Sequence, residues 1–143
     1  MDGATEIFEQ RRNQCAAILQ RLLAAPAYSF DDRLRSQLPA QHGLYVIAQK
    51  NSPQCQYLHA GESPRAGLRE RIWTQHYCGG DAKRGSSDLI QKVMDNHRLG
   101  RPDAKLWVRE NCIVQWLVLE DDDVLRCWAE HYMLSLLRPI WGR

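Results

Sequence analysis

The chain has 143 residues, of which 44% are hydrophobic and 25% charged, and its formal net charge is +2. This length allows one domain with a buried core, and the composition is ordinary for a soluble globular protein. No apolar run reaches the roughly 18 residues that a membrane span needs, and the first residues lack the apolar core of a signal peptide. We therefore expect a cytoplasmic protein without a membrane partner.

The cysteines and the basic residues exclude few classes of function. The five cysteines are odd in number and form no CxxC pair, so neither a disulfide framework nor a structural zinc site is expected. Residues 62–105 hold nine Lys or Arg against six Asp or Glu. Such a segment is compatible with nucleic acid, but alone it is more typical of a solvated surface.

The first 40 residues predict a helical leader. An apolar stripe with polar residues on the other side indicates a helix over 4–24, which Pro26 ends, and a short second helix is expected within 28–38. This leader, 1–40, is set apart from a domain over 41–143. Its first helix is also a candidate surface for a homodimer.

The remaining elements predict an α+β fold: a small, mainly antiparallel sheet flanked by helices. β-Branched and aromatic residues indicate a hairpin of strands at 43–49 and 56–60, joined by a turn rich in Asn, Ser and Pro. In chain order there follow helices over 63–77 and 87–100, strands over 104–111 and 112–120, and a helix over 121–137. Ser63 is a candidate cap for the first of these helices.

Glu130 is the least expected residue of the last helix. Apolar residues cover nearly the whole circumference of this helix, and Glu130 points between Leu134 and Leu137. A carboxylate in such a place is costly unless it is paired, hydrogen-bonded or bound to a metal ion. The residues alone leave two interpretations open, a buried salt bridge to an arginine and a metal ligand. The acidic triplet at 121–123 is most simply the cap and first turn of the helix.

Four short motifs in order resemble the GIY-YIG nuclease family over residues 43–142. "GLY" (43–45) is similar to the first motif, and "HAGES" (59–63) is similar to the second, with its glycine at Gly61. "LRERI" (68–72) resembles the arginine helix of the family, and "AEHYMLSLLRPIW" (129–141) resembles its glutamate helix. A shifted register, with "YLH" (57–59) as the second motif, loses that glycine.

The resemblance implies an endonuclease that hydrolyses phosphodiester bonds, with DNA as the substrate and RNA as an alternative. It implies that Tyr45 orients or deprotonates the attacking water, that Arg71 contacts the scissile phosphate, and that Glu130 holds one Mg²⁺ or Mn²⁺ ion. Arg69 is the second candidate for the arginine. Further candidate contacts to substrate are Gly61, Arg69 and His76, and the candidates to track phosphates are Lys83, Arg84, Arg98 and Arg101.

Two positions depart from the family pattern. His59 stands where the second tyrosine belongs, and Gly142 stands where an asparagine is usual. A histidine has an ordinary pKa of about 6.5, so His59 is a candidate base for the same water. Tyr57, two residues earlier, is expected on the same side of the strand but too far along it to take over. The departures leave an alternative open, a catalytically attenuated module that binds nucleic acid, and a third is a protein-interaction domain.

Overall fold

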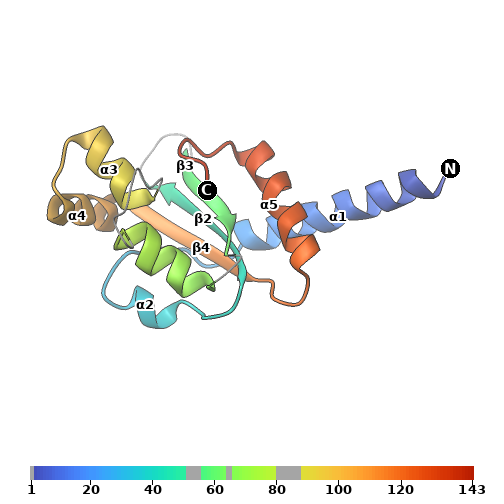
Figure 1. The fold of residues 1–143 in the computed structure, drawn as a ribbon, viewed down its shortest axis with the longest axis horizontal. Coiled ribbons are helices and arrows are strands. Elements are labelled where there is room, and N and C mark those ends of the chain that lie inside the picture. The colour runs from blue at the N-terminus through green and yellow to red at the C-terminus, as the bar shows by residue number, and fades with distance from the viewer. Residues whose placement is uncertain (1, 51–55, 64–65, 80–87) are drawn as a thin grey trace.

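The computed structural model describes residues 2–50, 56–63, 66–79 and 88–143, and Figure 1 shows their arrangement. The elements in chain order are helix α1 (Gly3–Leu23), strand β1 (Tyr28–Ser29), helix α2 (Leu34–Gln37), strands β2 (Gly43–Gln49) and β3 (Gln56–Glu62), π-helix η1 (Glu70–Tyr77), helices α3 (Leu89–His97) and α4 (Arg101–Asn111), strand β4 (Cys112–Val118) and helix α5 (Asp123–Leu137).

The sheet has four strands in the order β1-β4-β2-β3, and all three pairings are antiparallel. The prediction of an α+β fold with a small antiparallel sheet and an N-terminal helix is therefore confirmed. Strand β2 lies inside the sheet and is buried from Gly43 to Ala48. Burial on both faces explains its continuous apolar sequence, because a strand with one solvated face would alternate with polar residues.

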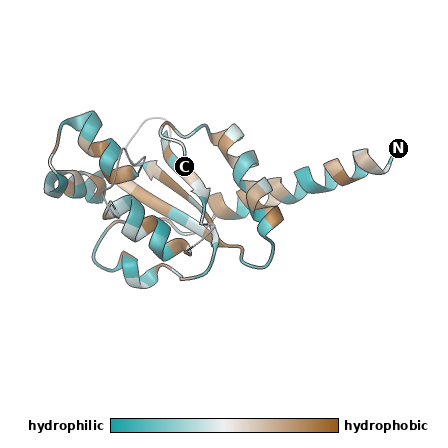
Figure 2. Ribbon diagram, viewed as in Figure 1, coloured by the Kyte–Doolittle hydropathy of each residue, from teal (hydrophilic) through white to brown (hydrophobic). Residues whose placement is uncertain are grey.

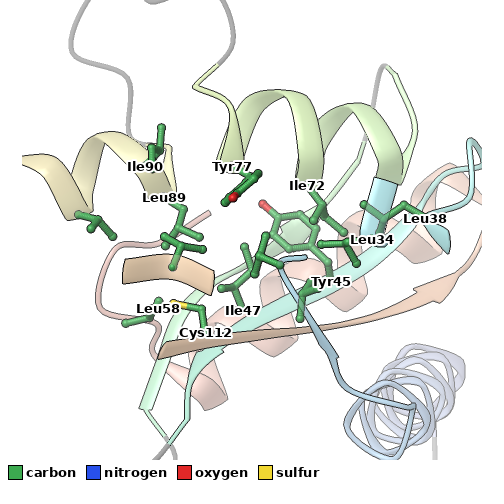
Figure 3. Close-up of a cluster of buried hydrophobic side chains, with 14 of the residues drawn as sticks. Leu34, Leu38, Tyr45, Ile47, Leu58, Ile72, Tyr77, Leu89, Ile90 and Cys112 are labelled. Atoms are coloured by element: carbon green, nitrogen blue, oxygen red, sulfur yellow. The ribbon is translucent and has the colours of Figure 1, made fainter. Parts of the chain in front are cut away.

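Helices cover both faces of the sheet (Figure 1). Leu44 and Val46 pack against α1 and α5, whereas Tyr45 and Ile47 belong to a core shared with α2, η1, α3 and α4. This division follows from the alternation of side chains along a strand. In Figure 2 the strands carry much of the hydrophobic colouring, and Figure 3 shows Tyr45 and Ile47 inside the second core.

The predicted strand at 104–111 is wrong, because these residues belong to α4. Gly100 precedes the helix and Pro102 lies in its first turn, where a missing N–H costs nothing. Ala104 and Val108 are both fully buried and lie one helical turn apart. The chain then passes into β4 without a connecting loop.

The helix predicted over 63–77 begins later than expected. Residues 66 and 67 are not helical, and Ser63 does not cap the helix. Its hydroxyl instead accepts a hydrogen bond from the backbone N–H of Gly43, at 3.0 Å. Ser63 thus ties the end of β3 to the start of β2.

The leader residues contribute to the core and to the sheet. Leu22 is fully buried against α5, and Ile18 lies in the same cluster. Within 28–38, where a helix was expected, Tyr28 and Ser29 pair with β4 and only the four residues of α2 are α-helical. The beginning of α1 projects away from the other elements (Figure 1), which leaves Ile7 and Phe8 exposed.

An irregularity in the hairpin separates Tyr57 from His59. The pairing of β2 with β3 shifts by one residue between Ile47 and Ala48. Tyr57 therefore packs against the cluster under α1 and α5, whereas the ring of His59 lies against His76 on the other side. The prediction that both face the same side was wrong, because it assumed a regular strand.

Candidate active site

Tyr45 is the centre of a buried hydrogen-bond network. It lies on β2 directly opposite Gly61 of β3, and its side chain is fully buried. Its hydroxyl oxygen lies 2.8 Å from Nε2 of His76 and 3.1 Å from Nε of Arg71. Both partners come from η1, so one helix supplies both of these hydrogen bonds to the Tyr45 oxygen.

The π-helix explains how both residues of η1 reach Tyr45. Hydrogen bonds in a π-helix run from residue i to i+5, so residue i+5 takes the place that i+4 has in an α-helix. Arg71 and His76 are five residues apart and meet at the same oxygen. Gln75, at the intervening position, instead accepts a hydrogen bond of 2.7 Å from Nη1 of Arg71.

The hydrogen bonds assign the proton on His76. The backbone N–H of Leu89 donates to Nδ1 of His76 at 3.1 Å, so this nitrogen carries a lone pair. Burial lowers the pKa of His76 well below its ordinary value, and the ring is neutral. Its proton is therefore on Nε2 and is donated to the Tyr45 oxygen.

Tyr45 is a poor base in this environment. Burial raises its pKa to about 12, although the neighbouring Arg71 acts in the opposite direction. The oxygen accepts hydrogen bonds from Arg71 and His76, so its own proton has to point in a third direction. The Tyr45 hydroxyl is therefore better placed to donate a hydrogen bond than to accept a proton.

The Glu130 carboxylate, on α5, also lies near Gly61 and the Tyr45 hydroxyl. It is 3% exposed on α5, and its Oε2 accepts a hydrogen bond of 2.7 Å from the backbone N–H of Glu62. Because β3 is an edge strand, this N–H has no partner strand and needs an acceptor. A Cβ placed on Gly61 would lie 3.1 Å from the Tyr45 oxygen and 3.3 Å from Oε2 of Glu130.

The second oxygen of Glu130 pairs with an arginine. Nη2 of Arg143 lies 2.9 Å from Oε1, and the Arg143 side chain is 56% exposed. The salt-bridge interpretation of Glu130 is thus confirmed in this state of the molecule. The nearby Glu62 carboxyl pairs with the buried Arg126, and its pKa is raised by burial and by the charge of Glu130.

His59 is fully buried and neutral. Its Nδ1 donates to the backbone carbonyl of Arg143 at 2.8 Å, and burial lowers its pKa to about 4. Nε2 therefore carries a lone pair, and it has no hydrogen-bond partner among the described residues. A ring in this state is able to accept a proton only at an acidic pH.

A cavity of about 270 Å³ opens where these elements meet. Arg71 and Glu130 are on its wall, and Tyr45 lies directly behind Arg71. The wall is formed by Glu62, Ser63, Ala66, Gly67, Arg71, Gln75, Glu130 and Arg143. The cavity thus combines two carboxylates, of Glu62 and Glu130, with two guanidinium groups, of Arg71 and Arg143, and a guanidinium group suits an anionic oxygen of a substrate.

The donor set fits a single hard cation. Mg²⁺ in proteins commonly keeps several waters and uses one or two carboxylates, and Glu130 offers one carboxylate to an open cavity. Among the described residues no cluster of three or more acidic, His or Cys side chains is arranged to hold a metal. Asp122 caps α5 through the N–H of Leu125, and Asp123 pairs with Arg126, as expected for the first turn of a helix.

Several candidate residues lie elsewhere. Arg69 is bound through Nε to the backbone carbonyls of Arg35 and Leu38, away from the cavity. Arg98 ends α3, and Arg101 donates to the carbonyl of Cys78. Lys83 and Arg84 lie outside the described residues, and so does Cys55; the other four cysteines are free thiols.

The sequence motifs did not indicate Arg143, Glu62 or Gln75. The only available signal for Gln75 was its spacing of four residues from Arg71, which is the spacing of side-chain pairs on a helix. Arg143 lies just beyond the glutamate-helix motif, and its role depends on how the chain after α5 returns to β3. Such a contact between distant parts of the chain has no local pattern.

Comparison of the chain with protein-family models, with curated proteins and with solved structures gives no significant match. The resemblance to the GIY-YIG nucleases therefore rests on the four motifs and remains a hypothesis. None of the described helices has the length and apolar character required to span a membrane.

Proposed function

We propose that this chain is a metal-dependent endonuclease that hydrolyses phosphodiester bonds in DNA through a GIY-YIG-type site. One observation carries the proposal: Arg71 and Glu130 line a single cavity, and Tyr45 lies directly behind it in contact with Arg71. These three residues come from three separate motifs of the sequence. Two of them border the same cavity, and the third contacts one of these two from behind.

Arg71 is the residue that binds the scissile phosphate. Its Nε and Nη1 are held by Tyr45 and Gln75, and Asp88 lies 3.7 Å from Nη1. The two protons of Nη2 bond to no described residue, and the side chain borders the cavity. A guanidinium fixed on one side and free on the other is well placed to stabilise charge on a phosphate oxygen.

Tyr45 orients the reacting oxygen in this proposal. Of the two roles expected from the sequence, orientation has more support than deprotonation, because the pKa of Tyr45 is about 12. His76 and Arg71 hold the hydroxyl oxygen in place, so that its own proton points away from both of them. His76 and Tyr45 are both fully buried and neither lies on the cavity wall, so His76 acts through Tyr45, and Tyr45 acts on the reacting oxygen through Arg71.

Glu130 would hold the metal ion. A bound Mg²⁺ or Mn²⁺ would neutralise charge on the phosphate and lower the pKa of a coordinated water. The carboxylate is aimed at the cavity by the N–H of Glu62, which leaves Oε1 as the oxygen that faces a cation.

A second candidate function is binding of nucleic acid without cleavage. It is favoured by His59, which is buried and neutral where the family has a tyrosine, and by Arg143, which already neutralises Glu130. A protein of this kind would keep its affinity for DNA after loss of Glu130 and would not respond to metal.

The test is cleavage of supercoiled plasmid and of labelled single-stranded DNA with Mg²⁺ or Mn²⁺. We compare the wild type with Glu130→Ala and with Glu120→Gln, an exposed carboxylate at the start of the loop before α5. Cutting that disappears only in Glu130→Ala supports the proposal. DNA binding without cutting supports the second function, neither binding nor cutting favours an interaction domain, and equal cutting by all three proteins contradicts the site.

A further inference from the structure

Residues 140–143, here called the edge segment, lie along the free edge of β3. The N–H of Ile140 donates to the carbonyl of Tyr57 at 3.1 Å, and that of Trp141 donates to Leu58 at 3.0 Å. The N–H of Ala60 in turn donates to the carbonyl of Gly142 at 3.0 Å. Backbone groups that an edge strand leaves unpaired are thus satisfied by the chain that follows α5.

Two further features direct the edge segment toward Glu130. The indole of Trp141 packs on the core that contains Tyr45, with its ring centroid 5.9 Å from that of His59. Gly142 has a φ of +74°, a conformation that costs other residues free energy. Arg143 is then fixed by its carbonyl, which accepts the hydrogen bond from His59.

Arg143 occupies the oxygen of Glu130 that a metal ion would need. Oε2 is engaged by the N–H of Glu62, and Oε1 lies 2.9 Å from the Arg143 guanidinium. Among the described residues, no other cation pairs with Glu130. A guanidinium and a divalent ion repel each other, so binding of both to one carboxylate oxygen is unfavourable and the two cations compete for it.

We propose that Arg143 is an internal cation that competes with the metal ion for Glu130, so that the edge segment sets the metal affinity of the site. This inference rests on the proposed function, in which Glu130 is the metal ligand. In the metal-free protein Arg143 neutralises a buried carboxylate that would otherwise be unpaired. Metal binding requires the guanidinium to leave, and its exposed side chain has solvent to move into.

The test is the affinity of the full chain for Mn²⁺, measured by calorimetry and by the electron paramagnetic resonance signal of the free ion. We compare the wild type with Arg143→Gln, Arg138→Gln and Glu130→Gln. Arg138 is a matched control: it is exposed, it carries the same charge, and among the described residues no acidic side chain pairs with it.

Arg143→Gln should bind Mn²⁺ about three- to tenfold more tightly than the wild type, the range expected for loss of one charged contact. Arg138→Gln should stay within about twofold of the wild type, because a remote surface charge is screened. If Arg143→Gln and Arg138→Gln bind Mn²⁺ equally tightly and Glu130→Gln does not bind it, Glu130 is the metal ligand but Arg143 does not compete with the metal. That result would overturn the inference. Unchanged binding by Glu130→Gln would instead overturn the proposed metal site.

In a second measurement the titration itself is made on the wild-type protein. The Nε–H resonance of Arg143, assigned by its absence in Arg143→Gln, is followed in protein labelled with ¹⁵N-arginine during titration with Mg²⁺. Release from Glu130 should move this resonance toward the position of an exposed arginine. A resonance that stays in place at saturating Mg²⁺ contradicts the proposal.

Discussion

The Tyr45 hydroxyl and the Glu130 carboxylate approach each other across Gly61, the residue opposite Tyr45 in the hairpin. A methyl group on Gly61 would contact both, at 3.1 Å from the Tyr45 oxygen and 3.3 Å from Oε2 of Glu130. Two polar groups from opposite sides of the sheet thus share one small space, which exists because residue 61 has no side chain.

Gly61→Ala should therefore reduce cleavage much more than it reduces stability. The methyl would push apart two groups that act on one phosphate in the proposed function, and on that proposal we expect a loss of about 100-fold in kcat/KM. Overpacking of this kind costs about 1–3 kcal/mol of unfolding free energy. Initial rates on plasmid DNA and urea unfolding measure the two effects. Gly3→Ala, where an added methyl meets nothing within 4 Å, is the control; a wild-type rate in Gly61→Ala would contradict the shared space.

Tyr45→Phe should lower both activity and stability. Removal of the oxygen leaves the buried N–H groups of His76 and Arg71 without their acceptor, at a cost of about 1–3 kcal/mol. Tyr77→Phe is the control, because this ring packs in the same core and its hydroxyl makes no hydrogen bond to a described residue. Urea unfolding of both variants at pH 7 separates a lost hydrogen bond from a general effect of the substitution. Equal stability of the two variants would contradict the network.

The hairpin and the last helix were predictable because their patterns are local. A strand buried on both faces shows an apolar run, as at 43–49, and an acidic cap followed by an apolar helix shows at 122. Glu130 stood out for the same reason, since a carboxylate among apolar residues needs a partner. The meeting of Tyr45, Arg71 and Glu130 followed only from the family resemblance.

The errors have equally specific causes. Residues 104–111 contain both apolar and charged residues in a short run, and only the burial of Ala104 and Val108 on one helical face decides between strand and helix. His76 meets Tyr45 together with Arg71, five residues earlier, because η1 is a π-helix, and no sequence pattern indicated this element. Neither the π-helix nor the pairing of Arg143 with Glu130 leaves a local signal, because both depend on packing between distant segments.

The buried histidines predict that the protein loses stability in mild acid. The pKa of His59 is lowered from its ordinary value of about 6.5 to about 4, mainly by burial, with Arg71 and Lys92 acting in the same direction. Between these values the unfolded chain binds a proton that the folded chain does not. Stability is therefore complete above pH 6.5 and is lost as the pH falls toward 4.

At pH 5 the contribution of His59 to this loss should be about 2 kcal/mol. His59→Phe should remove that part of the pH dependence, whereas His131→Gln, at an exposed position, should not. The measurement is the urea unfolding free energy of each variant at pH 7 and pH 5. The difference between the two pH values is compared within each variant, so that the effect of repacking cancels. An unaltered difference in His59→Phe would mean that the ring is not kept neutral by burial.

Self-association through α1, expected from the sequence, requires a test that keeps the helix. Deletion of residues 4–24 would remove Ile18 and Leu22 from the core, so the loss of a dimer after deletion would be uninformative.

Phe8 is 65% exposed on the projecting part of α1, beside Trp128 in an apolar depression that also includes Cys15. Phe8→Glu should abolish a dimer that uses this surface, because it would bury a charge there. Asn13→Glu, an exposed polar position on the same helix, adds the same charge as a control. Light scattering after size exclusion at several concentrations gives the masses, and a dimer that persists in Phe8→Glu would place the contact elsewhere on the molecule.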